Sequence, residues 1–239
     1  MKQLIFGLSA LLLCAGAFAQ QINDPNAEPR DAKNFHAIKV SNAFDVFLTQ
    51  GDEEAVAVSA NDDEVKQHIR VDVDGGVLLI WLEGEKKFWK SWKGNKKLKA
   101  YVSFKTLDKL IASGACDIHL MNTLKSENLV VDFSGASDLK GKLEINNTLD
   151  VELSGASDMQ VSGSASQLKA NLSGACDFKG YDLVTDYCDI KASGASGVDI
   201  TVNKELSANV SGASDINYKG AGLIRDLKSS GASSIKKRS

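Results

Sequence analysis

A five-residue turn, Ser-Gly-Ala-(Ser/Cys)-(Asp/Gly/Ser), recurs through the second half of this chain at intervals of 18 to 21 residues. The seven copies begin at Ser113, Ser134, Ser154, Ser173, Ser193, Ser211 and Ser230. A fixed period of this length is the signature of a solenoid, in which each repeat forms one coil that stacks on the next. The repeated turn therefore constrains the fold more than any other feature of the sequence, and says less about function.

The residues around each turn alternate between apolar and polar side chains. Ahead of the third turn, for example, Leu149, Val151 and Leu153 alternate with Asp150 and Glu152. Five residues after the leading serine, every copy has an apolar residue again: Ile118, Leu139, Met159, Phe178, Val198, Ile216 and Ile235. A period of two is typical of strands with one buried face. We therefore predict an all-β fold, a right-handed parallel β-helix of about seven coils of ~20 residues each.

The start of the chain has the pattern of an export signal. Lys2 precedes an apolar run at residues 4–13, and Ala17-Phe18-Ala19 is a small-x-small cleavage site, so residues 1–19 are expected to be removed. Residues 20–34 are polar, contain both prolines and are predicted to form a flexible leader. No later segment has the ~20 apolar residues needed to span a bilayer. We expect an exported protein located in the periplasm, on the outer surface or outside the cell.

Three cysteines remain after the expected cleavage, at positions 116, 176 and 188. Cys116 and Cys176 occupy the same corner position three coils apart, about 14 Å by strand spacing. A disulfide requires Cα atoms within about 7 Å of each other, so this pair should not form. Cys188 stands where other coils have an apolar core residue and should be a small buried hydrophobe.

The first half of the mature chain also has strand-like patterns, but with less regular spacing. Residues 35–110 contain several short β-type runs, separated by turns such as those at residues 50–52 and 74–76. This portion is predicted either to continue the solenoid as opening coils or to cap it with antiparallel strands, while residues 111–239 form the regular repeats. A cap is needed because an open parallel edge invites aggregation.

Several segments in this order resemble a known family. They are FHAIKV at residues 35–40, FDVFLTQG at residues 44–51 and GVLLI at residues 76–80, followed by the Ser-Gly-Ala-Ser-Asp corners. In these segments the chain resembles the family called putative auto-transporter adhesin, head GIN domain, over about residues 35–235. The resemblance implies an exported β-helical protein of pectin-lyase-like architecture with an adhesive role.

One corner position carries an aspartate in most coils. The members of this ladder are Asp117, Asp138, Asp158, Asp177 and Asp215. Carboxylates stacked about 5 Å apart repel each other by roughly 1 kcal/mol per pair in water, so something must offset the repulsion. We favour hydrogen bonds from backbone N–H groups of the same corner. Bound Ca²⁺, which takes several oxygen ligands, is the alternative and the only cofactor that the sequence suggests.

The segment from residue 83 to residue 99 combines seven lysines with aromatic side chains. The tentative ligand-binding residues within it are Lys86, Lys87, Phe88, Trp89, Lys90, Trp92 and Lys93. Exposed aromatic rings stack on sugars, and lysines attract phosphate, sulfate or acidic headgroups. The segment is thus a candidate contact surface for glycan, lipopolysaccharide or membrane. The alternative is a hairpin whose aromatic rings pack back onto the solenoid.

The sequence gives little support to catalysis. His36, His68 and His119 are scattered without motif spacing, and no zinc-ligand spacing, phosphate loop or dinucleotide fingerprint is present. The formal net charge of −3 gives no case for nucleic acid. We predict a non-enzymatic binding or adhesion module that binds a glycan or an envelope component. The sequence does not determine its oligomeric state. The alternatives are a lyase-like β-helical enzyme acting on acidic polysaccharide and a protein that binds another envelope protein.

Overall fold

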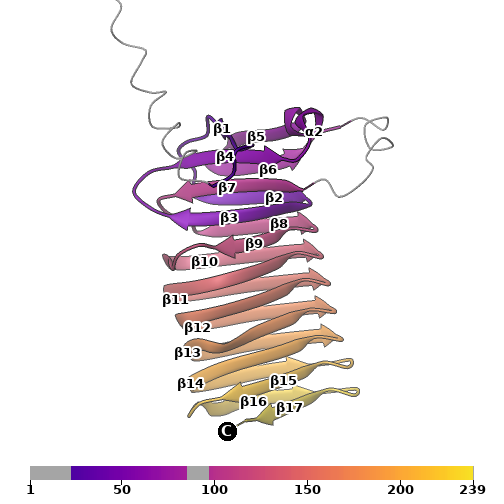
Figure 1. Cartoon of the computed structure of the whole chain (residues 1–239). Coiled ribbons are helices and arrows are strands. Elements are labelled where there is room, and N and C mark those ends of the chain that lie inside the picture. Colours follow the sequence, from indigo (N-terminus) through magenta and orange to yellow (C-terminus); the bar gives the residue numbers. More distant parts are fainter. Residues whose placement is uncertain (1–22, 85–96, 239) are drawn as a thin grey trace, which may run out of the picture.

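The computed structural model describes residues 23–84 and 97–238, which form a parallel β-solenoid of about 6 turns (Figure 1). This confirms the predicted parallel β-helix. The predicted signal peptide, residues 1–19, lies outside the described residues. Within residues 23–84 and 97–238, no helix combines the length and apolar character needed to cross a membrane.

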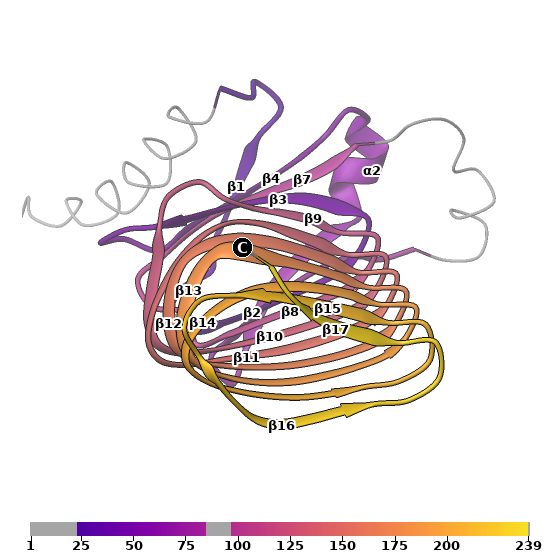
Figure 2. The ribbon, with the colours of Figure 1, turned by 90° about the horizontal axis from the view of Figure 1, so that it is seen from below.

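The regular repeats form long strands that wrap around the core and pair in parallel with the coils above and below. Their bounds are β8 Lys109–Gly114, β9 Asp117–Leu120, β10 Leu124–Gly135, β11 Asp138–Gly155, β12 Asp158–Gly174, β13 Asp177–Gly194, β14 Gly197–Val210, β15 Asp215–Lys219, β16 Leu223–Ser229 and β17 Ser234–Lys237. Seen along the solenoid axis in Figure 2, the coils superpose closely. Each Ser-Gly-Ala corner separates one strand from the next, and corner pairs with corner in register, as with Gly155 and Gly174.

The corner glycines allow the coils to approach each other. Gly155 has a φ of +79°, and a Cβ added there would lie 2.3 Å from the carbonyl oxygen of Gly135 in the previous coil. The same carbonyl oxygen accepts a hydrogen bond of 2.7 Å from the N–H of Ala156. The position requires both a positive φ and the absence of a Cβ, and glycine meets both requirements.

The fourth corner residue points into the core. At this position the following residues have buried side chains: Cys116, Ser137, Ser157, Cys176, Ser196 and Ser214. The hydroxyl of Ser157 donates a hydrogen bond to the Ser154 carbonyl (3.1 Å) and accepts one from the N–H of Ser137 in the previous coil (3.2 Å). These serines therefore satisfy backbone groups within an otherwise apolar interior. Among the described residues, no buried side-chain nitrogen or oxygen lacks a hydrogen-bond partner.

The cysteines behave as predicted. All three are free and buried, and the strand register places the corners of Cys116 and Cys176 three coils apart. Cys188 is 4% exposed in the apolar column, with its sulfur 2.9 Å from the Thr185 hydroxyl oxygen. Burial raises the pKa of each thiol, to about 11 for Cys188, so the three remain neutral thiols at neutral pH.

The N-terminal half supplies two further coils. Its elements are β1 Glu28–Arg30, β2 Ala37–Asn42, β3 Phe44–Gln50, β4 Ala55–Ala60, α2 Asp63–Gln67, β5 Ile69–Asp74, β6 Val77–Leu82 and β7 Leu98–Phe104. β2 and β3 pair in parallel with β8 and β9 on one edge and with β6 and β7 on the other. The β2–β3 coil is therefore inserted between two coils that follow it in sequence. Asn42, with a φ of +81°, occupies the place of the corner glycine and pairs with Gly114.

Antiparallel strands close the end of the solenoid beyond β6 and β7. β5 pairs with β6, β4 with β7 and β1 with β4, all antiparallel, and Val65 of α2 is buried there. Residues 35–110 thus contain both opening coils and an antiparallel cap. The expectation of a flexible leader fails for its described part, because Glu28–Arg30 forms β1. Asp24 also anchors the leader by accepting a 2.9 Å hydrogen bond from the Tyr101 hydroxyl.

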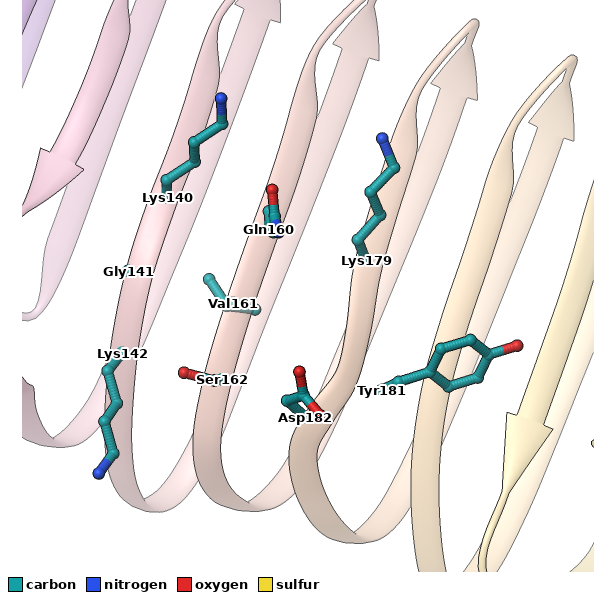
Figure 3. A pocket seen from close by; sticks show the side chains of 9 residues that line it. All are labelled: Lys140, Gly141, Lys142, Gln160, Val161, Ser162, Lys179, Tyr181 and Asp182. Atoms are coloured by element: carbon teal, nitrogen blue, oxygen red, sulfur yellow. The ribbon is translucent and has the colours of Figure 1, made fainter. Parts of the chain in front are cut away.

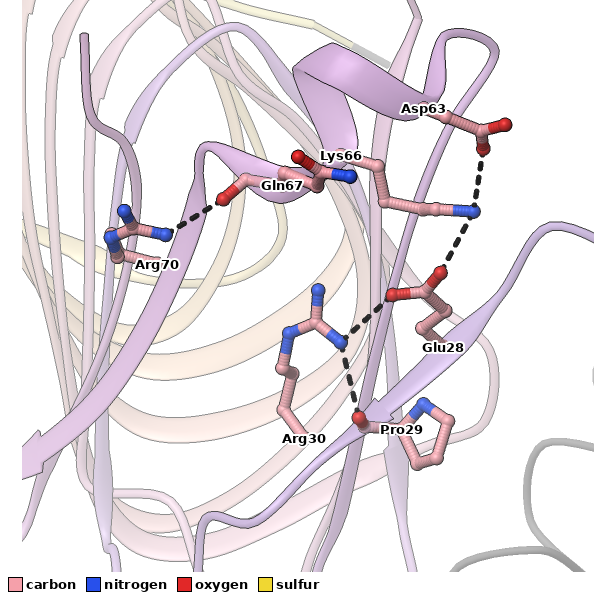
Figure 4. Close-up of polar contacts among 7 residues, drawn as sticks. All are labelled: Glu28, Pro29, Arg30, Asp63, Lys66, Gln67 and Arg70. Atoms are coloured by element: carbon pink, nitrogen blue, oxygen red, sulfur yellow. Dashed lines mark hydrogen bonds and ion pairs between the residues drawn. The ribbon is translucent and has the colours of Figure 1, made fainter.

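Ion pairs hold the leader strand against α2 (Figure 4). The Lys66 ammonium lies 2.9 Å from a Glu28 oxygen and 3.1 Å from an Asp63 oxygen, while Arg30 lies 3.2 Å from Glu28. The hydrogen bond from Lys66 lowers the pKa of Glu28, and the same bond to Glu28 raises the pKa of Lys66. Both shifts favour the charged pair at neutral pH.

We predict that this cap contact gives a small, pH-dependent stabilisation. Because the folded-state pKa of Glu28 is depressed, its contribution is full above the unfolded pKa of about 4.3 and is lost as the pH falls through the lower folded value. Replacing Glu28→Gln should therefore reduce the free energy of unfolding by about 0.5 kcal/mol at pH 7 and by less under acid conditions, since the pair is partly exposed. Urea unfolding at several pH values measures this difference. The exposed Glu152→Gln in β11 is the matched control, and an equal loss in both variants would contradict the prediction.

Candidate functional site

The predicted lysine and tryptophan surface lies between the end of β6 at Leu82 and the start of β7 at Leu98. Its candidate residues fall within residues 85–96, outside the described residues: Lys86, Lys87, Phe88, Trp89, Lys90, Trp92 and Lys93. Its role as a contact surface therefore stays a prediction.

The aspartate ladder runs in register along one outer edge of the solenoid. Asp138, Asp158 and Asp177 occupy paired positions on successive coils, and the ladder extends upward from Asp117 to Asp45. The backbone N–H of Asp158 donates to the Asp138 carboxylate (3.3 Å), and that of Asp177 donates to the Asp158 carboxylate (3.0 Å). The partner of the Asp138 and Asp158 carboxylates is thus the N–H of the next coil, not that of their own corner as expected. These bonds offset the repulsion between stacked carboxylates.

The ladder differs from the usual calcium arrangement. In residues 23–84 and 97–238, no three His, Cys, Asp or Glu side chains group closely enough to hold a metal ion. The position is filled by Gly197 in one coil, and Asp215 resumes the series below it. Calcium binding by the ladder remains a prediction of the sequence alone.

A groove lies beside the ladder, two residues further along the same strands (Figure 3). Its volume is about 580 Å³. It is lined by Lys140, Gly141, Lys142, Gln160, Val161, Ser162, Lys179, Tyr181 and Asp182. Lys140, Gln160 and Lys179 form one row on β11, β12 and β13, and Lys142, Ser162 and Asp182 form a second row next to it. The groove therefore crosses three successive coils.

Local backbone features shape this surface. Gly141 has no room for a side chain, since a Cβ there would lie 2.4 Å from the Cβ of Leu120 in the neighbouring coil. The register of β13 also shifts against both of its neighbours, between Gln160 and Gly163 of β12 and between Gly180 and Val184 of β13 itself. A bulge of this kind re-aims side chains and is common next to functional sites. Here it places Tyr181 and Asp182 at one end of the groove.

The groove is positively charged. It contains three lysines and one carboxylate, and its lysines are exposed. Lys179 lies 3.7 Å from Asp177 of the ladder, whereas Lys140 and Lys142 form no ion pair within the described part of the chain. Burial, helped by a hydrogen bond with Asp199, raises the pKa of Tyr181, so its phenol stays protonated at neutral pH. The site thus offers ammonium groups as hydrogen-bond donors, while the Tyr181 hydroxyl, whose single proton is donated to Asp199, can accept a hydrogen bond.

A stack of aromatic rings continues the lysine row toward the cap. The rings of Tyr101 and Phe47 lie 5.1 Å apart, and those of Phe47 and His119 lie 5.3 Å apart, all near parallel. His119 pairs in register with Lys140, so the stack and the groove share one outward-facing column. Stacked rings at a half-exposed surface are suited to packing against the apolar faces of sugars.

The model of the family described as putative auto-transporter adhesin, head GIN domain, matches residues 34–222. This chain belongs to that family. The match spans the cap apart from β1, the inserted β2–β3 coil and the whole groove of this GIN domain. Among curated proteins, none matches the chain.

Solved structures share the fold of this GIN-domain protein. A putative adhesin from Bacteroides fragilis has a TM-score of 0.81 at 22% identity, with 89% of this chain and 96% of that chain covered. A putative adhesin from Parabacteroides merdae has a TM-score of 0.70 at 19% identity, covering 89% and 95%. A putative lipid binding protein from Parabacteroides distasonis has a TM-score of 0.66 at 21% identity, covering 90% and 98%. At these identities the likeness shows the fold.

Proposed function

We propose that this GIN-domain protein is an exported, non-enzymatic adhesion module that binds acidic glycans along the lysine groove of β11–β13. The observation that carries the proposal is the groove of three lysines continued, in the same outward column, by the Tyr101, Phe47 and His119 rings. Membership of an adhesin family and the folds of its structural relatives support an adhesion-type role.

The chemistry of the column fits an acidic sugar chain. Ammonium groups bind carboxylates or sulfates, while Gln160, Ser162 and Tyr181 provide hydrogen bonds to hydroxyl groups. The aromatic rings provide an apolar surface for a sugar face at the end of the row. Since the groove crosses several coils of a rigid sheet, an extended glycan would meet successive lysines without a conformational change of the protein.

The groove favours binding over lyase chemistry. A lyase that removes a proton from an acidic sugar needs a base whose pKa lies near the working pH. Tyr181 is the phenol in the groove, and its pKa is raised above the ordinary value by burial, which moves it away from that requirement. The phenol that donates its proton to Asp199 can instead accept a hydrogen bond from a sugar hydroxyl.

The experiment is a glycan array followed by titration of the best acidic ligand. We expect binding to sulfated or uronic-acid glycans, and a loss of about tenfold in affinity for each of Lys140→Ala and Lys179→Ala, since each removes about one charge-assisted contact. Lys191→Ala, an exposed lysine of β13 away from the groove, should leave the affinity unchanged.

Two results would contradict the assignment to the groove. One is unchanged affinity in the double variant Lys140→Ala/Lys179→Ala, combined with loss of binding when residues 86–97 are removed, which would place the contact in the lysine and tryptophan segment. The other is no binding to any glycan on the array, which would favour a protein partner within the envelope.

A further inference from the structure

The C-terminal coil leaves one edge of the solenoid without a partner. Among the described residues, β16 pairs only with β14 and β17 only with β15. All seven residues of β16 are exposed, including the large apolar side chains of Leu223 (75%), Ile224 (51%) and Leu227 (36%). A strand edge of this kind presents a row of unpaired backbone donors and acceptors.

The exposed apolar side chains stand where other coils have core residues. Ile224 pairs with Leu206 and Leu227 with Ala208, and both of these β14 residues are buried. Among the described residues, the apolar columns of the core therefore end at Ile224 and Leu227, and no further coil covers these two side chains. Covering them with another apolar surface would be favourable by about 25 cal/mol for each Å² removed from water.

The C-terminal end of the solenoid carries an excess of positive charge, which favours an acidic partner surface. Residues 219–238 contain six basic residues and one acidic residue. Two of the basic side chains form ion pairs, with Arg225 lying 3.3 Å from Glu205 and Lys228 lying 2.7 Å from Asp226. Arg238 donates a 2.9 Å hydrogen bond to the Asn217 side chain, and the Lys219 ammonium lies 4.7 Å from the centre of the Tyr181 ring. Two such ends would repel each other, so a tail-to-tail contact is disfavoured.

The cap presents the opposite charge on another strand edge. β5 pairs only with β6 among the described residues, and its Asp72 and Asp74 are exposed. Val71 and Val73 face the other way and pack partly buried against the core. Residues 61–83 contain six acidic residues and two basic residues. The two ends therefore match in strand edge, apolar side chains and charge.

We propose that copies of this protein stack head to tail, with β16 of one copy pairing with β5 of the next. β6 connects to β16 through an unbroken series of parallel pairings, and β5 is antiparallel to β6, so a coaxial stack forms an antiparallel β16–β5 pair. Followed through these pairings, Val73 then falls in the column of Leu227, and Val71 falls in the column of Ser229. Such a heterologous contact uses different surfaces on the two copies, so it generates an open series instead of a closed dimer.

Stacking would repeat the groove along the assembly and so increase avidity for a polymeric glycan. The stacking itself does not depend on the proposed ligand. It follows from the two ends of the solenoid alone, and its test contains no glycan.

Sedimentation velocity of the purified protein over a range of concentrations provides the test. We expect an average mass that rises with concentration, and a weaker association at about 1 M salt, where screening acts within about 3 Å. Arg225→Glu/Lys228→Glu and Asp72→Lys/Asp74→Lys should each weaken association at least tenfold. An equal mixture of the two variants should associate again, because each altered end then meets an end of opposite charge.

Controls separate this result from misfolding and from general charge effects. Thermal unfolding of each variant verifies the fold, and Lys169→Glu/Lys191→Glu, which changes exposed residues of β12 and β13, should leave association unchanged. A protein that stays monomeric up to about millimolar concentration, the range of weak contacts, overturns the proposal. So does a mixture that fails to associate, or an association that only the β16 variant disturbs.

Discussion

Replacing Gly155→Ala is expected to lower the free energy of unfolding by more than about 3 kcal/mol, enough to disrupt the coils on either side. The added Cβ would lie 2.3 Å from the Gly135 carbonyl oxygen, and both atoms belong to backbone that the stacked sheet holds in place. The φ of +79° adds strain for any residue with a side chain. Because the corners repeat, the clash must separate two coils or distort both corners. Urea unfolding followed by circular dichroism measures the loss.

Two other glycines separate the contributions to this effect. Gly75 also has a positive φ, of +56°, but a Cβ there meets nothing within 4 Å, so Gly75→Ala should cost only about 1–2 kcal/mol. Gly51 has ordinary backbone geometry, and its added Cβ would lie 3.7 Å from the Ser103 hydroxyl, so Gly51→Ala should be close to neutral. If Gly155→Ala and Gly75→Ala cost the same, close coil contact is not the reason for the repeated glycine.

Replacing Ser157→Val should cost about 2–4 kcal/mol, the next largest effect we predict. The hydroxyl of Ser157 is fully buried and bonds both the Ser154 carbonyl and the Ser137 N–H. Valine replaces the hydroxyl by methyl groups and is larger than serine by one heavy atom, so it leaves both backbone groups without a partner in a tightly packed, dry interior. The same unfolding measurement tests this, with hydrogen exchange at the Ser137 amide as a local readout.

Ser157→Cys is the matched control, because two coils already use cysteine at this position. The Cys176 thiol donates to the Ser173 carbonyl at 3.4 Å, much as the Ser157 hydroxyl donates to Ser154. The cysteine variant should therefore lose less stability than the valine variant. Equal losses would mean that the hydroxyl acts only as a small space-filling group and not as a hydrogen-bond partner.

The regular coils were predictable from the sequence because their determinants are local and repeated. The apolar alternation around Leu149, Val151 and Leu153 identified the buried face, and the spacing of the serines identified the register. That register placed Cys116 and Cys176 three coils apart, as the structure has them. A short repeated pattern carries this information many times over, so small irregularities do not obscure it.

The cap was not predictable to the same degree because its coils are stacked out of sequence order. β2 and β3 lie between β6–β7 and β8–β9, and Asn42 stands where the repeats have glycine. The sequence alone therefore left open whether this half formed coils or a cap. One usable signal was overlooked: Asp45 follows Asn42 at the same spacing at which Asp117 follows Gly114.

The groove was missed for a related reason. Its shape depends on a bulge at residues 181–183, which appears in the sequence only as a small departure from the period. The ring stack joins Tyr101, Phe47 and His119, which are remote in sequence and meet only through the inserted coil. Sequence reasoning instead favoured the dense lysine and tryptophan segment, where composition is conspicuous.

The most direct test of glycan binding in the groove is amide NMR of the protein titrated with an oligogalacturonate, with a neutral oligosaccharide as control. The proposal predicts saturable shift changes at Lys140, Gln160, Lys179 and Tyr181, extending to His119, with the acidic ligand alone. Saturable changes confined to residues outside this column would contradict it, as would equal changes with the neutral sugar.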